Sequence, residues 1–213
     1  MNKKKREAIE KLVRSKAALL VIDMQYDYCS PNGMVPRRRK LDVSPITRML
    51  PRLGKFISLA RERHIPVIWT RMIEDIEYMP PNFGTVMKSG KVVMPHICKP
   101  GTRGFGYYKL KPQKGDKEFI KTHYNAFTNK KLHEYLKKKG IKTLIFTGVY
   151  ASRCVDSTAR SASEKGYNCI ILRDLVEIAK EYQYEKRGSL SVIGTLFGFV
   201  VSSRGLTDIL QEI

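Results

Sequence analysis

Residues 142–166 read KTLIFTGVYASRCVDSTARSASEKG, and this stretch carries a strand, a turn and a helix in succession. The segment Lys142–Phe146 is short and rich in β-branched and apolar residues, as a buried parallel strand requires. After the turn, small and apolar residues recur at spacings of one, three and four, which predicts a helix that ends at Gly166. These residues are Cys154, Val155, Thr158, Ala159 and Ala162. The pattern indicates a sheet of parallel strands connected by helices, with a cysteine in the first turn of one helix.

This cysteine, Cys154, has two interpretations. A free cysteine is commonly a small buried hydrophobic residue without a chemical role. In the first turn of a helix, however, the aligned peptide dipoles favour the thiolate, which is the nucleophilic form. The choice between the two depends on whether partner residues exist elsewhere in the chain.

Length and composition indicate one domain of ordinary size. The chain has 213 residues, of which 42% are hydrophobic, and we expect a basic N-terminal extension over residues 1–16 followed by a single domain over 17–213. No apolar run approaches the roughly 18 residues of a membrane span. The basic N-terminus also lacks the apolar segment of a secretory signal. These features predict a soluble, cytoplasmic protein without a membrane partner.

The four cysteines, Cys29, Cys98, Cys154 and Cys169, are widely spaced. They form no Cys-x-x-Cys pair and no cluster with histidine at the spacing of a zinc site. This spacing argues against a disulfide scaffold and against a structural zinc ion.

The net charge of +20 is the most unusual bulk property. Residues 2–16 and the run Arg37–Lys40 together supply nine of these charges. Such a surface permits an alternative function, in which the protein binds nucleic acid or an acidic partner and retains a vestigial or weakly active site. Because no RNA-binding motif or aromatic platform accompanies the basic runs, we expect a solvated surface and no nucleic-acid partner.

Strands and helices are predicted to alternate along the whole chain. The other expected strands are Ala17–Ile22, Pro66–Thr70, Glu118–Ile120, Cys169–Leu172 and Phe197–Val201. The other expected helices are Glu7–Ser15, Pro45–Arg63, Asn129–Lys139, Tyr184–Leu196 and Leu206–Leu210. Tyr26–Val43 and residues 72–116 contain many Gly and Pro residues and are predicted to be long loops. The alternation predicts a parallel sheet with helices on both faces and right-handed crossovers.

Three strand ends carry residues that suit nucleophilic catalysis. Asp23, Lys121 and Cys154 each follow or close a predicted strand, and the carboxyl ends of parallel strands share one edge of the sheet. Asp23 alone could simply cap a turn. Together, however, they supply a base that returns its proton to a leaving nitrogen, a cation and a nucleophile. The backbone amides of Tyr150 and Cys154 could then form an oxyanion hole.

Four segments resemble the isochorismatase-like cysteine hydrolases, over about Ala17 to Ile213. The segments are ALLVIDMQ at 18–25, PGT at 100–102, KTHYNAF at 121–127 and TGVYASRCVDSTAR at 147–160. The resemblance implies a three-layer α/β/α fold with a six-stranded, largely parallel sheet. It also implies a catalytic triad of Asp23, Lys121 and Cys154, and a cis peptide bond just before Tyr150.

Members of this family that keep the cysteine hydrolyse amide or ureido groups and release ammonia. The resemblance therefore implies a cysteine-dependent amidohydrolase that cleaves a small linear amide or carbamoyl compound through a thioester-type acyl-enzyme, without a cofactor. N-carbamoyl amino acids, ureidoacrylate, biuret and maleamate are examples of such substrates. Nicotinamidases in the family carry an Asp-x-His metal site after the second strand, but Arg71–Asn82 contains no histidine, so we expect no catalytic metal. The family also implies a homo-oligomer, either a dimer or a tetramer.

Three residues are predicted to contact the substrate. Tyr26 stands where many family members have the Asn of an Asn-Asp-Phe segment. Arg71 follows the second strand and could bind a substrate carboxylate through two parallel hydrogen bonds, although a solvent-facing position at a loop entrance is the alternative. Alternation along the strand would place Trp69 on the same face as Arg71.

Overall fold

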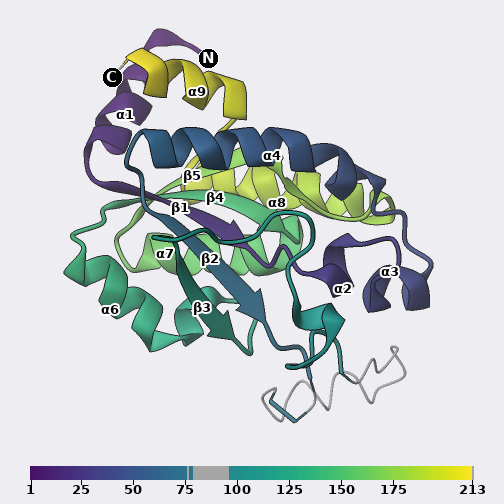
Figure 1. Ribbon diagram of the computed structural model, residues 1–213. Helices are drawn as coiled ribbons and strands as arrows, with labels where there is room; N and C mark the ends of the chain where they lie inside the picture. The colour runs from purple at the N-terminus through teal and green to yellow at the C-terminus, as the bar shows by residue number, and fades with distance from the viewer. Residues whose placement is uncertain (76, 79–95, 213) are drawn as a thin grey trace.

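The computed structural model describes residues 1–75, 77–78 and 96–212, and its centre is a sheet of six strands (Figure 1). The strands are β1 (Ala17–Ile22), β2 (Val67–Met72), β3 (Lys117–Lys121), β4 (Thr143–Val149), β5 (Asn168–Glu177) and β6 (Phe199–Val201). Their order across the sheet is β3-β2-β1-β4-β5-β6. All five neighbouring pairs are parallel, which confirms the predicted sheet.

Helices cover both faces of this sheet. One layer holds α1 (Lys3–Arg14), α4 (Ser44–Glu62) and α9 (Ser203–Glu212), and the other holds α6 (Lys130–Lys138), α7 (Asp156–Glu164) and α8 (Gln183–Leu196) (Figure 1). The three-layer α/β/α architecture is therefore confirmed. Among the described helices, none has both the length and the apolar character that crossing a membrane requires.

The central strand β1 determines where the reactive residues lie. All six of its residues are buried, because the strand is covered by helices above and below and flanked by β2 and β4. The chain continues from β1 to β2 on one side, and β4 lies on the other side. The carboxyl end of β1 is thus a point at which the direction of winding reverses, and ligands bind at such points in open α/β sheets.

The basic N-terminal segment is part of this folded unit. Residues 1–16, predicted as an extension, contain α1, whose Ile9 and Val13 are buried in the common core. Arg6 forms an ion pair with Glu212 of α9. Lys3, Lys4 and Lys11 are exposed on the outer side of this packed amphipathic helix, whereas Lys5 donates to the carbonyl oxygen of Val200 at 3.1 Å.

The segment Tyr26–Val43 differs from the long irregular loop that we expected. It forms two short helices, α2 (Tyr26–Cys29) and α3 (Met34–Arg39). Gly33 immediately precedes α3, and Pro36 lies in its first turn, where the missing N–H of proline has no intrahelical partner to lose. Gly and Pro thus mark a helix start here, and the expectation of a continuous loop was wrong.

Strand β5 is also longer than the predicted Cys169–Leu172. It continues to Glu177 through the charged residues Arg173 and Asp174. The carboxylate of Asp174 accepts hydrogen bonds from the amide and hydroxyl of Ser203, at 2.7 and 2.6 Å. The charge inside the strand therefore caps the start of α9.

A buried carboxylate, Asp116, fixes the edge strand β3 against its neighbours. It accepts hydrogen bonds from the Arg61 guanidinium of α4, the Trp69 indole of β2 and the backbone amide of Gln113. Burial by itself would raise the pKa of the Asp116 carboxyl, but these three donors lower the pKa overall. Because β3 begins at the next residue, the cluster also sets the position of Lys121 at the other end of the strand.

We expect Asp116→Asn to lower the free energy of unfolding by about 1–3 kcal/mol at pH 7, since the donors lose a charged acceptor. A carboxyl whose pKa is lowered by folding stabilises the protein above its unfolded pKa of about 4, and this contribution is lost as the pH falls through the lower folded pKa. The difference between wild type and variant should therefore shrink below about pH 4. Urea denaturation from pH 3 to pH 7 measures this difference in the free energy of unfolding. The control is Asp208→Asn, which changes an exposed carboxylate in the same way. A difference that is independent of pH would contradict this account.

Candidate active site

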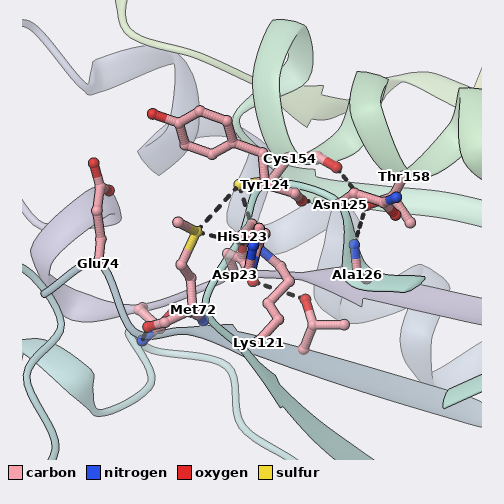
Figure 2. Close-up of polar contacts among 12 residues, drawn as sticks. Asp23, Met72, Glu74, Lys121, His123, Tyr124, Asn125, Ala126, Cys154 and Thr158 are labelled. Atoms are coloured by element: carbon pink, nitrogen blue, oxygen red, sulfur yellow. Dashed lines mark hydrogen bonds and ion pairs between the residues drawn. The ribbon is translucent and has the colours of Figure 1, made fainter. Parts of the chain in front are cut away.

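Three side chains from separate strand ends meet at the carboxyl edge of the sheet (Figure 2). Asp23 directly follows β1, Lys121 closes β3, and Cys154 lies in the turn after β4. All three are buried. The structure thus brings together the residues that the sequence placed at one sheet edge.

The Lys121 ammonium is the centre of this cluster. Its Nζ lies 2.6 Å from Oδ2 of Asp23 and 3.4 Å from Sγ of Cys154. It also donates to the carbonyl oxygen of His123 at 3.1 Å, and it lies 3.3 Å from the sulfur of Met72. A buried ammonium requires this degree of pairing, because an uncompensated charge in the interior is strongly destabilising.

The carboxylate of Asp23 is held by the neighbouring strand β2. The Thr70 hydroxyl donates to Oδ1 at 2.7 Å, and the Asp23 amide donates to the Thr70 carbonyl oxygen at 3.1 Å. The backbone of Asp23 has a φ of 51°, in the left-handed region that few residues other than glycine adopt. Such conformations persist where the surroundings hold the residue firmly, and they are concentrated at functional sites.

Close approach of β1 and β4 depends on Gly148. In the parallel register Gly148 stands opposite Ile22, and a Cβ atom built on it would lie 2.1 Å from the Ile22 carbonyl oxygen. Its φ of 105° is also outside the range of other residues. Only glycine therefore allows the end of β4 to lie this close to Asp23.

Cys154 lies in a π-helical turn, Ala151–Val155, that continues directly into α7. The carbonyl oxygen of Tyr150 accepts hydrogen bonds from the amides three and five residues later, at 3.0 and 3.2 Å. The peptide bond between Val149 and Tyr150 is cis, as the family resemblance implies. The turn presents the Cys154 sulfur toward the end of β1 (Figure 2).

The segment after β3 is fastened to the cysteine turn by Thr158 of α7. Its hydroxyl donates to the carbonyl oxygen of Cys154 at 2.6 Å and accepts from the amide of Ala126 at 3.0 Å (Figure 2). This one hydroxyl therefore helps to hold Lys121 and Cys154 at a fixed separation.

Burial raises the pKa of the Cys154 thiol well above its ordinary value. The Lys121 ammonium lowers this pKa, whereas the Asp23 carboxylate raises it, and burial dominates. Burial by itself would lower the pKa of Lys121, but Asp23 and Cys154 raise it overall. The resting site therefore holds a neutral thiol beside an ammonium–carboxylate pair, whereas the helix dipole had suggested a thiolate.

A profile of the Isochorismatase domain family matches residues 17–203. The chain belongs to the isochorismatase family. It is 30% identical over 194 residues to a protein named ureidoacrylate amidohydrolase RutB from Methylobacterium radiotolerans, and the match covers 85% of this chain and 74% of that protein. The chain is therefore a hydrolase that acts on carbon–nitrogen bonds other than peptide bonds.

Solved structures share the fold of this isochorismatase-family hydrolase. A cysteine hydrolase from Pseudomonas syringae superposes with a TM-score of 0.78 at 20% identity, covering 92% of this chain and 93% of the other. A zinc-bound pyrazinamidase from Pyrococcus horikoshii gives a TM-score of 0.73 at 21% identity, covering 88% and 99% of the two chains. At this level of identity the likeness establishes the fold.

The sequence patterns did not identify two residues of this region, Tyr28 and Glu74. The buried Glu74 follows β2, and its Oε2 accepts a hydrogen bond of 2.6 Å from the Tyr28 hydroxyl of α2. Charge on Glu74 raises the pKa of Cys154, so the two groups interact. Both Tyr28 and Glu74 lie in segments predicted as loops, which give no periodic signal.

The structure does not place Trp69 and Arg71 with the triad. The buried Trp69 donates its indole N–H to Asp116 at 2.9 Å, on the side of β2 opposite to Thr70. Arg71 forms an ion pair with Glu118, and its guanidinium lies 4.0 Å from the centre of the Phe105 ring. The two residues share one face, as alternation predicted, but Thr70 and Met72 on the other face reach the site.

Tyr26, the third predicted substrate contact, packs away from these groups. Its ring contacts Tyr108 edge-on at 5.9 Å, and the Arg103 guanidinium lies 4.2 Å from its centre. Tyr28, two residues later, donates its hydroxyl to Glu74 and packs edge-on against Tyr150, the residue that begins the cysteine turn.

Among the described residues, one group has the donor atoms to hold a metal ion. Ligand atoms of Asp75, Glu77 and His96 lie within 4.8 Å of one another. The Lys99 ammonium lies 3.9 Å from Asp75 and 3.5 Å from Glu77. A cationic side chain thus already lies between these two carboxylates.

The raised pKa of Cys154 in this family hydrolase predicts its reaction with iodoacetamide. We expect the alkylation rate without substrate to rise about tenfold per pH unit from pH 7 to pH 9, because the thiolate fraction rises by that factor below the pKa. Lys121→Met should slow alkylation at each pH, since it removes the cation that lowers the pKa. Peptide mass spectrometry measures the rate, and Cys154→Ala gives the background from the other cysteines. A plateau below pH 7 would contradict a neutral resting thiol.

Proposed function

We propose that this hydrolase is a cysteine-dependent amidohydrolase that releases ammonia from a small linear amide or carbamoyl compound. The observation that carries the proposal is the contact of one buried ammonium, that of Lys121, with both the Asp23 carboxylate and the Cys154 sulfur. A nucleophile, a proton acceptor and a fixed cation are the parts that attack on a carbonyl requires.

In the proposed reaction the Cys154 sulfur attacks the substrate carbonyl carbon while Asp23 takes the thiol proton. The carbonyl oxygen becomes an oxyanion, which the backbone amides of Tyr150 and Cys154 stabilise. Asp23 then gives its proton to the leaving nitrogen, the C–N bond breaks, and ammonia departs from a thioester. A water molecule, deprotonated by Asp23, hydrolyses the thioester and regenerates the thiol.

The direction of the pKa shifts supports this sequence of steps. A thiol that is neutral at rest needs a base at the moment of attack, and Asp23 lies on the other side of the same ammonium. Lys121 keeps its charge throughout, because its partners raise its pKa. It therefore acts as a fixed cation rather than as a proton donor.

The named relatives support ureido compounds as the first substrates to test. The proteins named ureidoacrylate amidohydrolase share 29–30% of their residues with this chain over 194 positions. A panel of ureidoacrylate, N-carbamoyl amino acids, biuret and maleamate would be assayed for release of ammonia. Intact-protein mass spectrometry after rapid acid quenching would detect the thioester as a mass increase on Cys154.

We expect Cys154→Ala, Asp23→Asn and Lys121→Met each to lower kcat/KM by more than about a hundredfold on any substrate of the panel, given the usual size of acid–base and electrostatic contributions. The three replacements are close in size to the originals, but Asp23→Asn leaves the buried Lys121 ammonium without its carboxylate, so circular dichroism must first show that each variant is folded. Cys169→Ala, which removes a buried thiol from β5, serves as the control and should retain activity. A Cys154→Ala protein with near-normal turnover would exclude the cysteine nucleophile.

We further propose that the chain forms a homo-oligomer through α8. Residues 188–200 include no charged residue in a chain of net charge +20. Within this range Val192 and Leu196, one turn apart on α8, are 40% and 70% exposed, so they share one side of the helix. A second copy can approach this apolar strip without meeting like charge, which is why a copy of the chain is the occupant that we propose.

Leu196→Glu should convert the oligomer to a monomer, because it places a charge on the apolar strip. Sedimentation velocity in moderate salt measures the mass, and Gln211→Glu on the exposed side of α9 adds the same charge elsewhere. A wild-type species near the chain mass of 24.5 kDa, or equal behaviour of the two variants, would contradict the α8 interface.

A further inference from the structure

Three connecting segments lie side by side at the amino edge of the sheet, opposite to the edge that holds Cys154. They cover residues 15–16, 137–142 and 165–168 and lead into the neighbouring strands β1, β4 and β5. The amide of Lys142 donates to the Lys16 carbonyl oxygen at 3.0 Å, and the amide of Asn168 donates to the Lys142 carbonyl oxygen at 2.9 Å. In Figure 1 the turns after α1 and α6 lie on the side of the sheet away from the strand arrowheads. Backbone hydrogen bonds thus join segments that are distant in the sequence into one surface.

This surface is strongly positive. The three segments contain six lysines and no aspartate or glutamate. All six lysines are exposed, and none forms an ion pair with a carboxylate of the described residues. Of the carboxylates just outside the segments, Glu10 is paired with Arg14 at 3.0 Å, and Glu164 is exposed next to Lys165. We call the six residues the basic edge, and they are Lys16, Lys137, Lys138, Lys139, Lys142 and Lys165.

The stability of the helices explains only part of this charge. Lys137 and Lys138 occupy the last turn of α6, where cations interact favourably with the helix dipole. Lys16 and Lys142 lie beyond the helix ends. The Lys16 ammonium lies 3.5 Å from the point where a Cβ atom on Gly140 would stand, so it is directed at the second segment. Cations gathered without carboxylates repel one another, and an anionic partner would remove this repulsion.

The width of the basic edge suits a long anion with regularly repeated charges. Neighbouring strands of a sheet are about 4.8 Å apart, so the three segments extend across roughly 10 Å. A nucleic-acid duplex carries one negative charge per about 1.7 Å of its axis, which gives about six phosphates over this width. The charge density of a duplex therefore matches that of the six lysines.

The other side chains of these segments indicate which part of a nucleic acid they would contact. The apolar residues Ile141 and Tyr167 are buried, and the exposed residues besides lysine are Gly166 and Asn168. The segments therefore expose no aromatic ring that could stack on the bases of a single strand and no apolar side chain that could enter a bilayer. Lysine binds phosphate as a point charge, and phosphate contacts carry no direct sequence information.

We infer that the basic edge binds the phosphate backbone of duplex nucleic acid without sequence preference. In the sequence the same lysines belong to separate runs, for which we expect only a solvated surface, but the fold gathers them on one edge of the sheet. Because this edge is opposite to Cys154, a bound duplex would leave the active site open. The inference does not depend on the proposed amidohydrolase function.

Fluorescence anisotropy with a labelled DNA duplex of arbitrary sequence, measured at several salt concentrations, tests this inference. We expect a Kd of about 1–100 μM near physiological salt, the usual range of non-specific binding. The triple variant Lys16→Gln, Lys139→Gln, Lys142→Gln should reduce the slope of log Kd against log salt concentration by about 2.7, because each phosphate contact contributes about 0.9. Its Kd should rise at least about tenfold. Lys142→Gln alone should reduce the slope by about 0.9 and applies the same test if the triple variant is unstable.

The matched control is Arg37→Gln, Arg38→Gln, Lys40→Gln. It removes the same charge from exposed residues of α3 and its C-cap, on the other side of the molecule from α1 and α6 (Figure 1). We expect it to change the slope by less than about 1.

Equal effects of the two triple variants would overturn the inference, because the net charge of +20 and not the basic edge would then attract the DNA. Absence of binding to the duplex would also overturn it. Tighter binding to a single strand of the same sequence would identify a surface that reads bases. Binding to phosphatidylserine vesicles as strong as that to the duplex, and weakened equally by the basic-edge variant, would identify a lipid surface as the partner. Either of these two results would reject the duplex.

Discussion

The buried ammonium of Lys121 is the interaction on which the site depends. Three strand ends deliver Asp23, Lys121 and Cys154 to one point, but a lysine in the interior is stable there only while its charge is compensated. Asp23 supplies that compensation at 2.6 Å. The need to pair this charge thus draws the end of the edge strand β3 toward the central strand β1, and Cys154 lies at the third corner. Structural stability and chemical function place the same demand on these residues.

Residue patterns in the sequence predicted much of the fold and the core of the site. Unbroken apolar runs such as Ala17–Ile22 indicated buried parallel strands, and the rule that their carboxyl ends share an edge brought together the three reactive residues. Alternation correctly placed Trp69 and Arg71 on one face of β2 but could not show which face meets the site. That depends on the helix layer against which each face packs, and the Asp116 cluster makes this choice.

Other features of the fold and the site leave no recognisable pattern in a single sequence. The turns around α2 and α3 contain Gly and Pro, which mark both loops and helix starts, so the helices there were missed. Glu74 is one charged residue in a long segment without periodicity, and its importance comes from hydrogen bonds to distant residues. The raised pKa of the Cys154 thiol could not be predicted from the sequence for the same reason. The helix dipole, which lowers this pKa, is a local effect that the sequence indicates, whereas burial, which outweighs it, depends on the whole packed site.

The close approach at Gly148 has a consequence for how the enzyme would respond to mutation. No atom of this residue takes part in the proposed chemistry, yet a methyl group at its Cβ position would collide with the Ile22 carbonyl oxygen. The collision would push apart the two strands that carry the base and the nucleophile. If every residue were replaced in turn and turnover measured, substitutions at Gly148 would therefore lower activity about as much as substitutions in the triad. The only requirement at this position is the absence of a side chain. The positions at which this enzyme tolerates no substitution therefore include residues that set the distance between two backbones as well as residues that react.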